Sequence, residues 1–577
     1  MTPHERSFTG CVLAFFGLAF LLACGMGGSA SSNGTESPRG FDGGTSQGTG
    51  GSTMGGFGSG GATVIPGRTD AGQSDLPPEQ EVDVSFQVPV ATGDFVWIAN
   101  PQSGRVAYVD AATLTVKTVA AGNAPTYIAA VPGSANEVVV FNVLSHDATI
   151  LRSDAGVLSS VMVPGVAPLA NAWALSPDGH FALAWTDSRR ALASATGHSS
   201  LEGFQDLSVI DLTTIPPAAV TVTVGYRPVS VTFSGDARAA YVVTTDGVSV
   251  VELAGPVRVS RDVALTDDPN EDADTRDVSI TPGGKAVVRR EGQPDVRIVD
   301  LATGTAGAIT LSGPVTDLDV TPDGTRAIAV VRDTSEIAIV PLATTSPDPA
   351  TVLRETIGTE VIGSAALTAD GKQAILFSNA AASERLTVVD LTTGTYRIVH
   401  VHAPVLSAIP TPDGQYAVVL HRLAAAPPDA GTPAVDGGAR DAGPTDAGAV
   451  APLPLVAANA FSVIPLDGSR AGRIQETNAP PVAVALSPAS DHALVTVRDD
   501  RGSVFGAYLV GIPGLDVTTL KLASPPIATG VVATANRGYV AQSHPEGRIT
   551  FIPFSGTSPQ TLTGFDLGAR VVDGVSP

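Results

Sequence analysis

One short phrase recurs along the chain and constrains its fold more than any other feature. At 317–340 it reads DLDVTPDGTRAIAVVRDTSEIAIV. Shorter versions are ALSPDGHFALAW (174–185), SITPGGKAVV (279–288), LTADGKQAILF (367–377) and PTPDGQYAVVL (410–420). Self-similarity at a regular spacing is typical of architectures in which each unit buries its apolar face against the next unit. The phrase therefore predicts a repeat protein.

A single unit can be read strand by strand between 315 and 359. It contains VTDLDV, the turn TPDG, RAIAVV, the loop RDTSE, IAIVPL and a more variable strand, TVLRETI. In such a turn, proline pre-sets the backbone angle of the second position, and glycine tolerates a positive φ at the close. Short alternating runs of Val, Ile, Ala and Thr between turns are typical of β-strands. Four antiparallel strands in about 40–50 residues match one propeller blade, so the sequence predicts an all-β propeller.

The number of units and the way they close are open on sequence alone. Turn markers near 131, 176, 234, 281, 321, 368, 411, 487 and 533 indicate about ten units. Propellers typically have four to eight blades, which leaves one large ring, two smaller rings, or a ring with degenerate units. The first unit, 94–122, begins at its second strand, and ARVVDGVSP (569–577) reads as an unpaired first strand. Pairing the two would remove both free sheet edges, which favours one ring closed by the C-terminal strand.

Residues 95–145 show the family resemblance most clearly. The segment VWIANPQSGRVAYVDAATLTVKTVAAGNAPTYIAAVPGSANEVVVFN resembles the YVTN-type β-propeller repeat, and the similarity decays through 93–577. It departs from that pattern at SGDA, at TANRG and at the long inserts. The resemblance implies the propeller fold. It does not imply one activity, because relatives include surface and secreted proteins of unknown role and, more distantly, lactonase-like propellers.

The N-terminus reads as a targeting segment. An apolar run from Cys11 to Ala23 is too short to span a bilayer and suits the core of a signal peptide. It ends in LLAC (21–24), which resembles the bacterial lipobox and implies cleavage before Cys24 and a lipid on its thiol. Gly25 follows in place of the aspartate of an inner-membrane signal. We expect a signal peptide at 1–23 and a lipid-anchored protein of the bacterial outer membrane, either periplasmic or surface-exposed.

Composition supports this organisation. Residues 24–84 are rich in Gly, Ser and Thr, cannot bury a core, and predict a disordered tether ahead of a propeller at 85–577. The Ala/Pro/Asp/Gly segment 423–458 predicts a disordered insert. Cys11 and Cys24 are the only cysteines, so the processed chain would hold no disulfide. The formal net charge of −23 argues against a nucleic-acid partner.

The sequence offers weak metal-site candidates and no catalytic residues. The loop 266–277 carries oxygen ligands suited to Ca²⁺, although its spacing does not match an EF-hand: Asp267, Asp268, Glu271, Asp272 and Asp274. His400 and His402 lie two apart in a predicted strand and would share one face, where they could bind Zn²⁺ or Cu²⁺. The turn residues Asp178, Asp323, Asp370 and Asp413 are expected to cap their own turns.

The predicted topology separates tight turns from long loops. The turns that join the first strand to the second and the third to the fourth fall on one face of a propeller. The irregular segments 186–205, 266–277 and 423–458 fall on the opposite face. Loops on a rigid scaffold commonly carry function. We therefore expect a non-catalytic binding or scaffold module with a protein or glycan partner. The alternative is a lactonase-like or other hydrolytic enzyme with its site at the mouth of the central channel.

Overall fold

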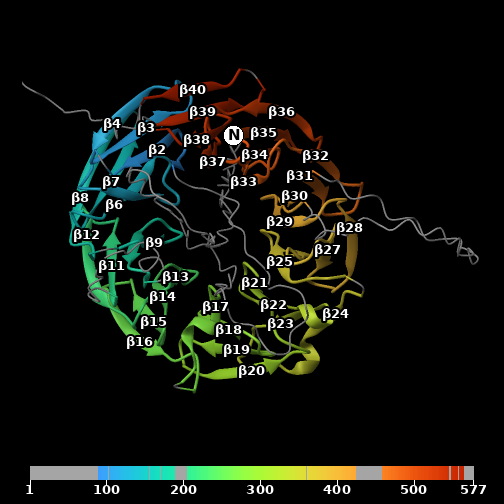
Figure 1. The fold of residues 1–577 in the computed structure, drawn as a ribbon. Coiled ribbons are helices and arrows are strands. Elements are labelled where there is room, and N and C mark those ends of the chain that lie inside the picture. Colours follow the sequence, from blue (N-terminus) through green and yellow to red (C-terminus); the bar gives the residue numbers. More distant parts are fainter. Residues whose placement is uncertain are drawn as a thin grey trace, which may run out of the picture.

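The structure is a computed structural model, and it describes residues 89–564 apart from 102, 155, 169, 189–203, 269, 359, 424–457, 545–546 and 557. The predicted signal peptide, tether and C-terminal strand lie outside the described residues, as does most of the predicted insert. Ten separate four-stranded antiparallel sheets follow one another along the chain. They are arranged around a common axis in one ring (Figure 1). The chain is a ten-bladed β-propeller, as the repeat predicted.

Each blade uses four consecutive strands, which we call a to d from the axis outward. The first five blades are β1 (Val90–Ala91), β2 (Phe95–Asn100), β3 (Arg105–Asp110) and β4 (Val116–Ala120); β5 (Pro125–Ala130), β6 (Glu137–Asn142), β7 (Asp147–Asp154) and β8 (Val157–Pro164); β9 (Ala172–Leu175), β10 (Phe181–Trp185), β11 (Asp206–Asp211) and β12 (Ala218–Thr223); β13 (Ser230–Phe233), β14 (Ala239–Thr244), β15 (Gly247–Glu252) and β16 (Arg258–Val263); and β17 (Arg276–Ile280), β18 (Lys285–Arg290), β19 (Asp295–Asp300) and β20 (Ala306–Thr310).

The last five blades are β21 (Asp317–Val320), β22 (Arg326–Val331), β23 (Glu336–Pro341) and β24 (Leu353–Thr356); β25 (Ser364–Leu367), β26 (Gln373–Phe377), β27 (Arg385–Asp390) and β28 (Tyr396–His400); β29 (Val405–Pro410), β30 (Tyr416–His421), β31 (Ala460–Pro465) and β32 (Arg473–Glu476); β33 (Pro481–Leu486), β34 (His492–Asp499), β35 (Val504–Gly511) and β36 (Asp516–Lys521); and β37 (Pro526–Val532), β38 (Arg537–Gln542), β39 (Arg548–Pro553) and β40 (Gln560–Thr563). The short 3₁₀ helices are η1 (Ala273–Thr275), η2 (Arg332–Thr334) and η3 (Pro349–Thr351).

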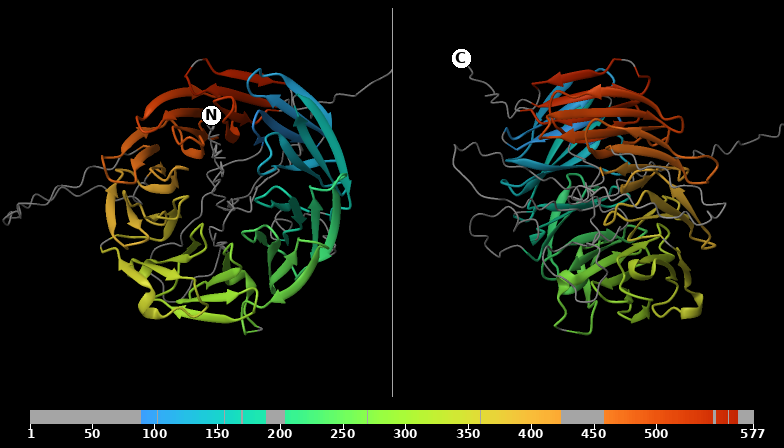
Figure 2. Two further views of the ribbon diagram at one scale, coloured as in Figure 1. Left: turned by 180° about the vertical axis from the view of Figure 1, so that it is seen from behind. Right: turned by 45° about the vertical axis from the view of Figure 1, so that its right-hand side comes forward.

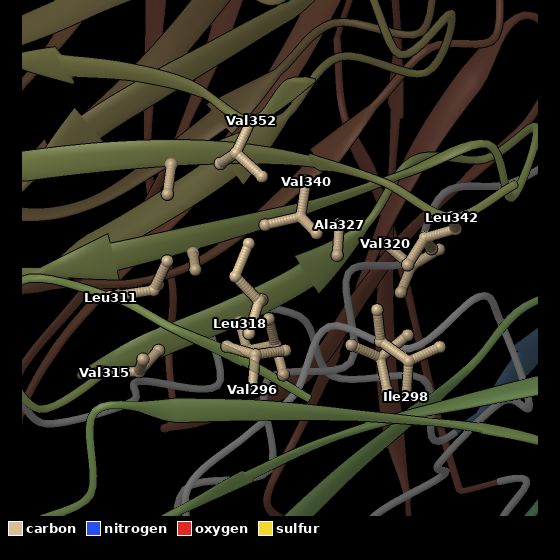
Figure 3. Packing of buried hydrophobic residues seen from close by; sticks show 14 of the residues in the cluster. Val296, Ile298, Leu311, Val315, Leu318, Val320, Ala327, Val340, Leu342 and Val352 are labelled. Atoms are coloured by element: carbon tan, nitrogen blue, oxygen red, sulfur yellow. The ribbon is translucent and has the colours of Figure 1, made fainter. Parts of the chain in front are cut away.

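The hydrophobic core is divided into ten clusters, and each cluster fills the space between two neighbouring blades. Between blades 5 and 6, Val296 and Ile298 of β19 pack against Leu318 and Val320 of β21 (Figure 3). Both faces of a blade are therefore covered. Strand b of blade 6, β22, is buried continuously after its first residue, whereas the alternating runs expected from the sequence would have left one face exposed.

The outermost strands differ because one of their edges meets solvent. In β12, AAVTVT, only Ala219 and Val222 are half-buried and the other four residues are exposed, so the strand is covered far less than the inner strands. The sheets are twisted, so the outer strands wrap the ring as a continuous wall (Figure 2).

Closure of the ring differs in detail from the expectation. The first blade does have a strand a: β1 pairs with β2 through Val90 opposite Trp97 and Ala91 opposite Val96. That strand occupies the place that the sequence analysis assigned to 569–577, which lie outside the described residues. β1 is only two residues long and directly follows Pro89, which is why it is hard to recognise from sequence.

Blades 10 and 1 meet through side chains at this seam. Val96 and Val109 pack with Tyr539 and Phe551 in one buried cluster. The Tyr539 hydroxyl donates a hydrogen bond of 2.8 Å to the Pro89 carbonyl, and burial raises the pKa of this phenol. Arg537 Nη1 donates to the Ala111 carbonyl at 2.8 Å. These contacts join two segments more than four hundred residues apart in the chain.

The seam gives a stability prediction. Replacing Tyr539 with Phe leaves the buried Pro89 carbonyl without its donor and should lower the free energy of unfolding by about 1–2 kcal/mol. Tyr396→Phe is the control, since Tyr396 is 40% exposed on an outer strand. Denaturant unfolding of both variants checks this; equal stability of Tyr539→Phe and the parent would contradict the proposed role of the phenol at the seam.

Candidate functional site

The two faces of the ring carry different kinds of connection, as predicted. The a–b connections and most c–d connections are short turns on one face, which we call the turn-bearing face; the c–d connection of blade 6, residues 342–352, is longer and contains η3. The b–c and d–a connections lie on the opposite, loop-bearing face. On that face, 186–205 join β10 to β11, 266–277 lead into β17, and 423–458 join β30 to β31. Residues 189–203 and 424–457 of these segments lie outside the described residues.

The turn aspartates cap their own turns, as expected. Asp323 Oδ1 accepts hydrogen bonds from the Thr325 backbone N–H (3.0 Å) and from the Thr321 hydroxyl (2.6 Å). Burial alone would raise the pKa of Asp323, but the hydrogen bonds from Thr321 and Thr325 outweigh it and lower that pKa. Equivalent hydroxyl-to-carboxylate bonds occur at Asp178, Asp370 and Asp413. These carboxylates are committed to the fold.

The sequence analysis missed the residue that anchors each of these turns. A Ser or Thr stands two positions before the aspartate, and its buried hydroxyl also accepts the backbone N–H that opens strand b, as at Thr321 and Arg326 (3.1 Å). The a–b turn then bonds the c–d turn of its own blade: the Leu391 N–H donates to the Lys372 carbonyl at 2.8 Å. The recurring Ser/Thr before Pro or Ala was the available signal. The turn-bearing face is thereby fixed by hydrogen bonds.

The acidic loop on the loop-bearing face spreads its carboxylates among different partners. Asp267 pairs with Arg297 (2.8 Å), and Glu271 contacts Arg276 (3.4 Å) and Arg290 (3.2 Å). Asp268 accepts the Asn270 N–H at 2.9 Å, and Asp272 caps η1 by accepting the Asp274 N–H at 3.1 Å. Among the described residues, no three His, Cys, Asp or Glu side chains are grouped so as to hold a metal ion.

The prediction that His400 and His402 share one face of a strand is wrong. β28 ends at His400, and His402 has a φ of 60°, so it has left the strand. The two imidazoles nevertheless stack, with ring centroids 6.4 Å apart. The strand ends before Ala403-Pro404, and Pro404 has no backbone N–H to donate to a ladder.

A buried charged cluster lies at the inner ends of blades 5 and 6 on the loop-bearing face. Arg289 Nε donates to Asp277 Oδ2 at 3.1 Å, and its Nη1 donates to the Val315 carbonyl of the next blade at 3.3 Å. Asp317 accepts the Leu318 N–H at 3.0 Å and, across the next blade boundary, the Ala365 N–H at 2.6 Å. Burial raises the pKa of Asp317 to about 6, despite the Ala365 hydrogen bond and the nearby Arg289.

A second buried polar pair lies where the long insert leaves blade 8. His421, the last residue of β30, is fully buried; its Nδ1 lies 3.3 Å from the Pro404 carbonyl and its Nε2 lies 2.7 Å from the Ser462 hydroxyl. Because a carbonyl can only accept, Nδ1 carries the proton and Nε2 accepts from Ser462. Burial lowers the pKa of His421 to about 4, so it is neutral at physiological pH.

Some titratable side chains of this face link neighbouring blades, as Asp317 does, and others pair within one blade, as Asp277 and His421 do. Glu360, with its side chain 4% exposed, pairs with Arg385 at 2.8 Å. Buried charges persist when paired and hydrogen-bonded, and breaking such a pair is costly. Asp277 and Asp317 lie close enough to interact beside Arg289, and most of the other described carboxylates of this face have separate partners.

Comparisons with known proteins find distant likenesses among solved structures. No protein-family model and no curated protein matches the chain. A structure of the eukaryotic initiation factor is 14% identical, covers 75% of this chain and 96% of its own, and has a TM-score of 0.47. Dihydro-heme d1 dehydrogenase NirN is 13% identical, with 67% and 73% covered and a TM-score of 0.39. Hydrazine synthase of Kuenenia stuttgartiensis is 18% identical, with 58% and 99% covered and a TM-score of 0.29. Likenesses this distant carry no inference about activity.

Within residues 89–564 as described, no helix has the length and apolar character needed to cross a membrane.

The Asp317 cluster gives a prediction about pH. A carboxyl whose pKa is higher in the folded than in the unfolded state stabilises the fold at low pH, and this contribution is lost as pH rises through the folded value. The free-energy difference between the parent and Asp317→Asn should therefore fall by on the order of 2 kcal/mol from pH 4 to pH 7. Denaturant unfolding across that range measures it.

Asp323→Asn is the matched control for that experiment. Hydrogen bonds lower the pKa of Asp323, so its contribution to the free energy of unfolding changes below pH 4. That contribution should be constant from pH 4 to pH 7. If the stability difference between the parent and Asp317→Asn is constant from pH 4 to pH 7, Asp317 is already ionised in the fold at pH 4 and the prediction is wrong.

Proposed function

We propose that this chain is a lipid-anchored extracytoplasmic β-propeller that binds a protein or glycan partner through its loop-bearing face and is not itself an enzyme. The observation that carries the proposal is that buried carboxylates of that face are paired with arginines. Asp277, Glu271 and Glu360 are each bound to arginines between or within blades, which leaves the connecting segments as the variable surface. Variable segments held on a rigid ring suit recognition.

The anchor is part of the same proposal. The segment that ends in Cys24 has the length of a signal-peptide core and the LLAC ending of a lipobox. The Gly/Ser-rich residues that follow it would span about 40–45 Å as a flexible chain, which would hold the ring clear of an outer-membrane surface.

The alternative function is a lactonase-like or other hydrolytic enzyme with its site at the channel mouth. The raised pKa of Asp317 favours it, because perturbed carboxyl groups are common in catalytic sites. Its two oxygens, however, accept the N–H groups of Leu318 and Ala365, so the carboxyl group is engaged by the fold. We therefore prefer the binding role.

Photocrosslinking tests the binding face. A photoreactive residue is placed at Leu144 or Leu423, which are 66% and 52% exposed on the loop-bearing face, or at the exposed Thr392 of a c–d turn. In intact envelopes we expect a discrete crosslinked product from Leu144 or Leu423 and none from Thr392. A product from Thr392 alone, or equal products from all three positions, would contradict a loop-face partner.

The anchor has its own test. Cys24→Ser removes the thiol that would carry the lipid, and we expect the variant to move from the membrane fraction to the soluble extracytoplasmic fraction. Cys11→Ser is the control, because that cysteine would be removed with the signal peptide and its loss should leave the distribution unchanged. Continued membrane association of Cys24→Ser would refute the anchor while leaving the crosslinking result to decide the binding face.

A further inference from the structure

The outer wall of the ring contains a groove between blades 4 and 5, and its rim reaches the acidic loop at Asp267. It has a volume of about 650 Å³ and lies between the outer strands β16 and β20. The lining residues that matter for the argument are Arg261, Asp262, Asp267, Arg297, Ala306 and Ala308. Small-molecule sites commonly measure about 300–1,000 Å³, so the groove has room for a ligand of one to a few rings.

The groove is hollow because the outer strand of blade 5 carries small side chains. In β20, Ala308 stands opposite Arg297 of β19, and Ala306 stands opposite Val299. Val299 belongs to the cluster shared with blade 4, so Ala306, Ala308 and Arg297 also face blade 4. The corresponding strand of blade 6, β24, turns Arg354 toward the preceding blade, where its Nη2 donates to the Thr310 carbonyl at 2.9 Å. β20 has no such side chain to fill its interval.

Arg297 presents an incompletely used guanidinium to this space. Its side chain is 24% exposed, and its Nη2 donates to Asp267 Oδ2 at 2.8 Å. Its Nε is buried and has no hydrogen-bond partner among the described residues. A guanidinium can bind a carboxylate with two parallel N–H groups. Asp267 uses one of them, and its own side chain is 89% exposed.

Arg261 supplies a second guanidinium on the opposite wall. Its Nη1 donates to the Ala302 carbonyl of blade 5. Arg397 makes the same kind of contact with the Pro465 carbonyl at 2.7 Å, and Arg473 does so with the Gly514 carbonyl. Arg261 is therefore first a tie between blades. In blade 4 this tie borders an open groove, where the positive charge of Arg261 adds to that of Arg297.

The nearby acids define what else the groove can bind. Asp262 accepts the Ser249 hydroxyl at 2.5 Å, and Asp295 accepts the Thr310 hydroxyl at 2.5 Å, so both are committed to hydroxyl donors. Asp267 remains at the rim, where its exposed carboxylate can accept hydrogen bonds from hydroxyl groups. Ala306 and Ala308 give a flat apolar wall. These features suit a ligand with a carboxylate, hydroxyl groups and the C–H face of a ring. A sugar acid carries all three.

We propose that the groove between blades 4 and 5 binds a sugar acid, with the ligand carboxylate on Arg297 and Arg261 and its hydroxyl groups on Asp267. The ligand is either a free sugar acid or a uronic-acid unit within a glycan. The ring face of the sugar packs on Ala306 and Ala308. The site lies on the outer wall and meets the loop-bearing face at Asp267, and it does not depend on the lipid anchor.

Calorimetric titration of the full chain with galacturonate, trigalacturonate, galactose and a tri-glutamate peptide tests the proposal. We expect binding of one or both uronates and none of galactose or the peptide. Tighter binding of the trimer would indicate a glycan, and equal binding would indicate a free sugar acid. Absence of uronate binding, or equal binding of galactose, would overturn the proposal, and binding of the peptide in place of the uronates would overturn the sugar-acid assignment.

Two variants locate the site. Arg297→Gln removes the charge, and Ala308→Leu fills the groove while leaving every charge in place; each should weaken uronate binding by about ten-fold or more. Two controls should bind as the parent does: Arg258→Gln, at a 69% exposed position of β16 outside the groove lining, and Ala218→Leu on β12. Thermal unfolding verifies that each variant is folded. Should Arg297→Gln not fold, Ala308→Leu decides, and uronate binding unchanged in it would refute this location.

Discussion

The fold depends on one constraint: every blade must bury both of its faces against neighbouring blades. The ten core clusters correspond to the ten intervals of the ring, including the one between the last blade and the first. An open array would leave the apolar faces of blades 1 and 10 in water. Burial of apolar surface contributes roughly 25 cal/mol per Å², so closing the seam through residues such as Val96 and Phe551 stabilises the whole ring.

Apolar packing between twisted sheets is poorly directional, and the buried polar groups supply the missing specificity. Asp317 reaches the backbone of strand a in the next blade, and Arg289 reaches a backbone carbonyl in another. Asp317 and His421, both buried, change the stability of the fold in opposite directions when the pH is lowered. Protonation of Asp317 favours the fold, whereas the pKa of His421, lowered to about 4 by burial, means that acid favours the unfolded chain. Between pH 4 and pH 6 the two contributions oppose each other.

The repeat made most of the fold predictable. The turn TPDG and the strands around it predicted β21 to β24 to within about two residues, because proline, aspartate and glycine have fixed roles in such turns. Blade number was also accessible from the turn markers. Strand a of blade 1 was not, because only Val90 and Ala91 pair there and no repeat phrase precedes them.

The contacts that define the candidate sites were less accessible. Arg289 and Asp317 lie in different blades, and nothing in local spacing predicts that each bonds the backbone of a neighbour. Asp267 was visible as one acid among several in a loop, but its partner Arg297 stands thirty residues away on a strand. The groove itself arises from small residues in β20, a feature that acquires meaning only when the adjacent blade is in place.

Because both faces of each blade are buried against its neighbours, few parts of the ring remain where side chains could bind a ligand. Most side chains of the inner strands point toward neighbouring blades, as Asp317 does when it binds the Ala365 N–H. An exception is Ile527, which lies at a bulge of the inner strand β37 and is 43% exposed. The turn-bearing face is fixed by its own hydrogen bonds, such as those of Thr321 and Asp323. Most side chains free to meet a partner therefore come from the loop-bearing face or from the outer strands, which is the physical reason for proposing recognition there.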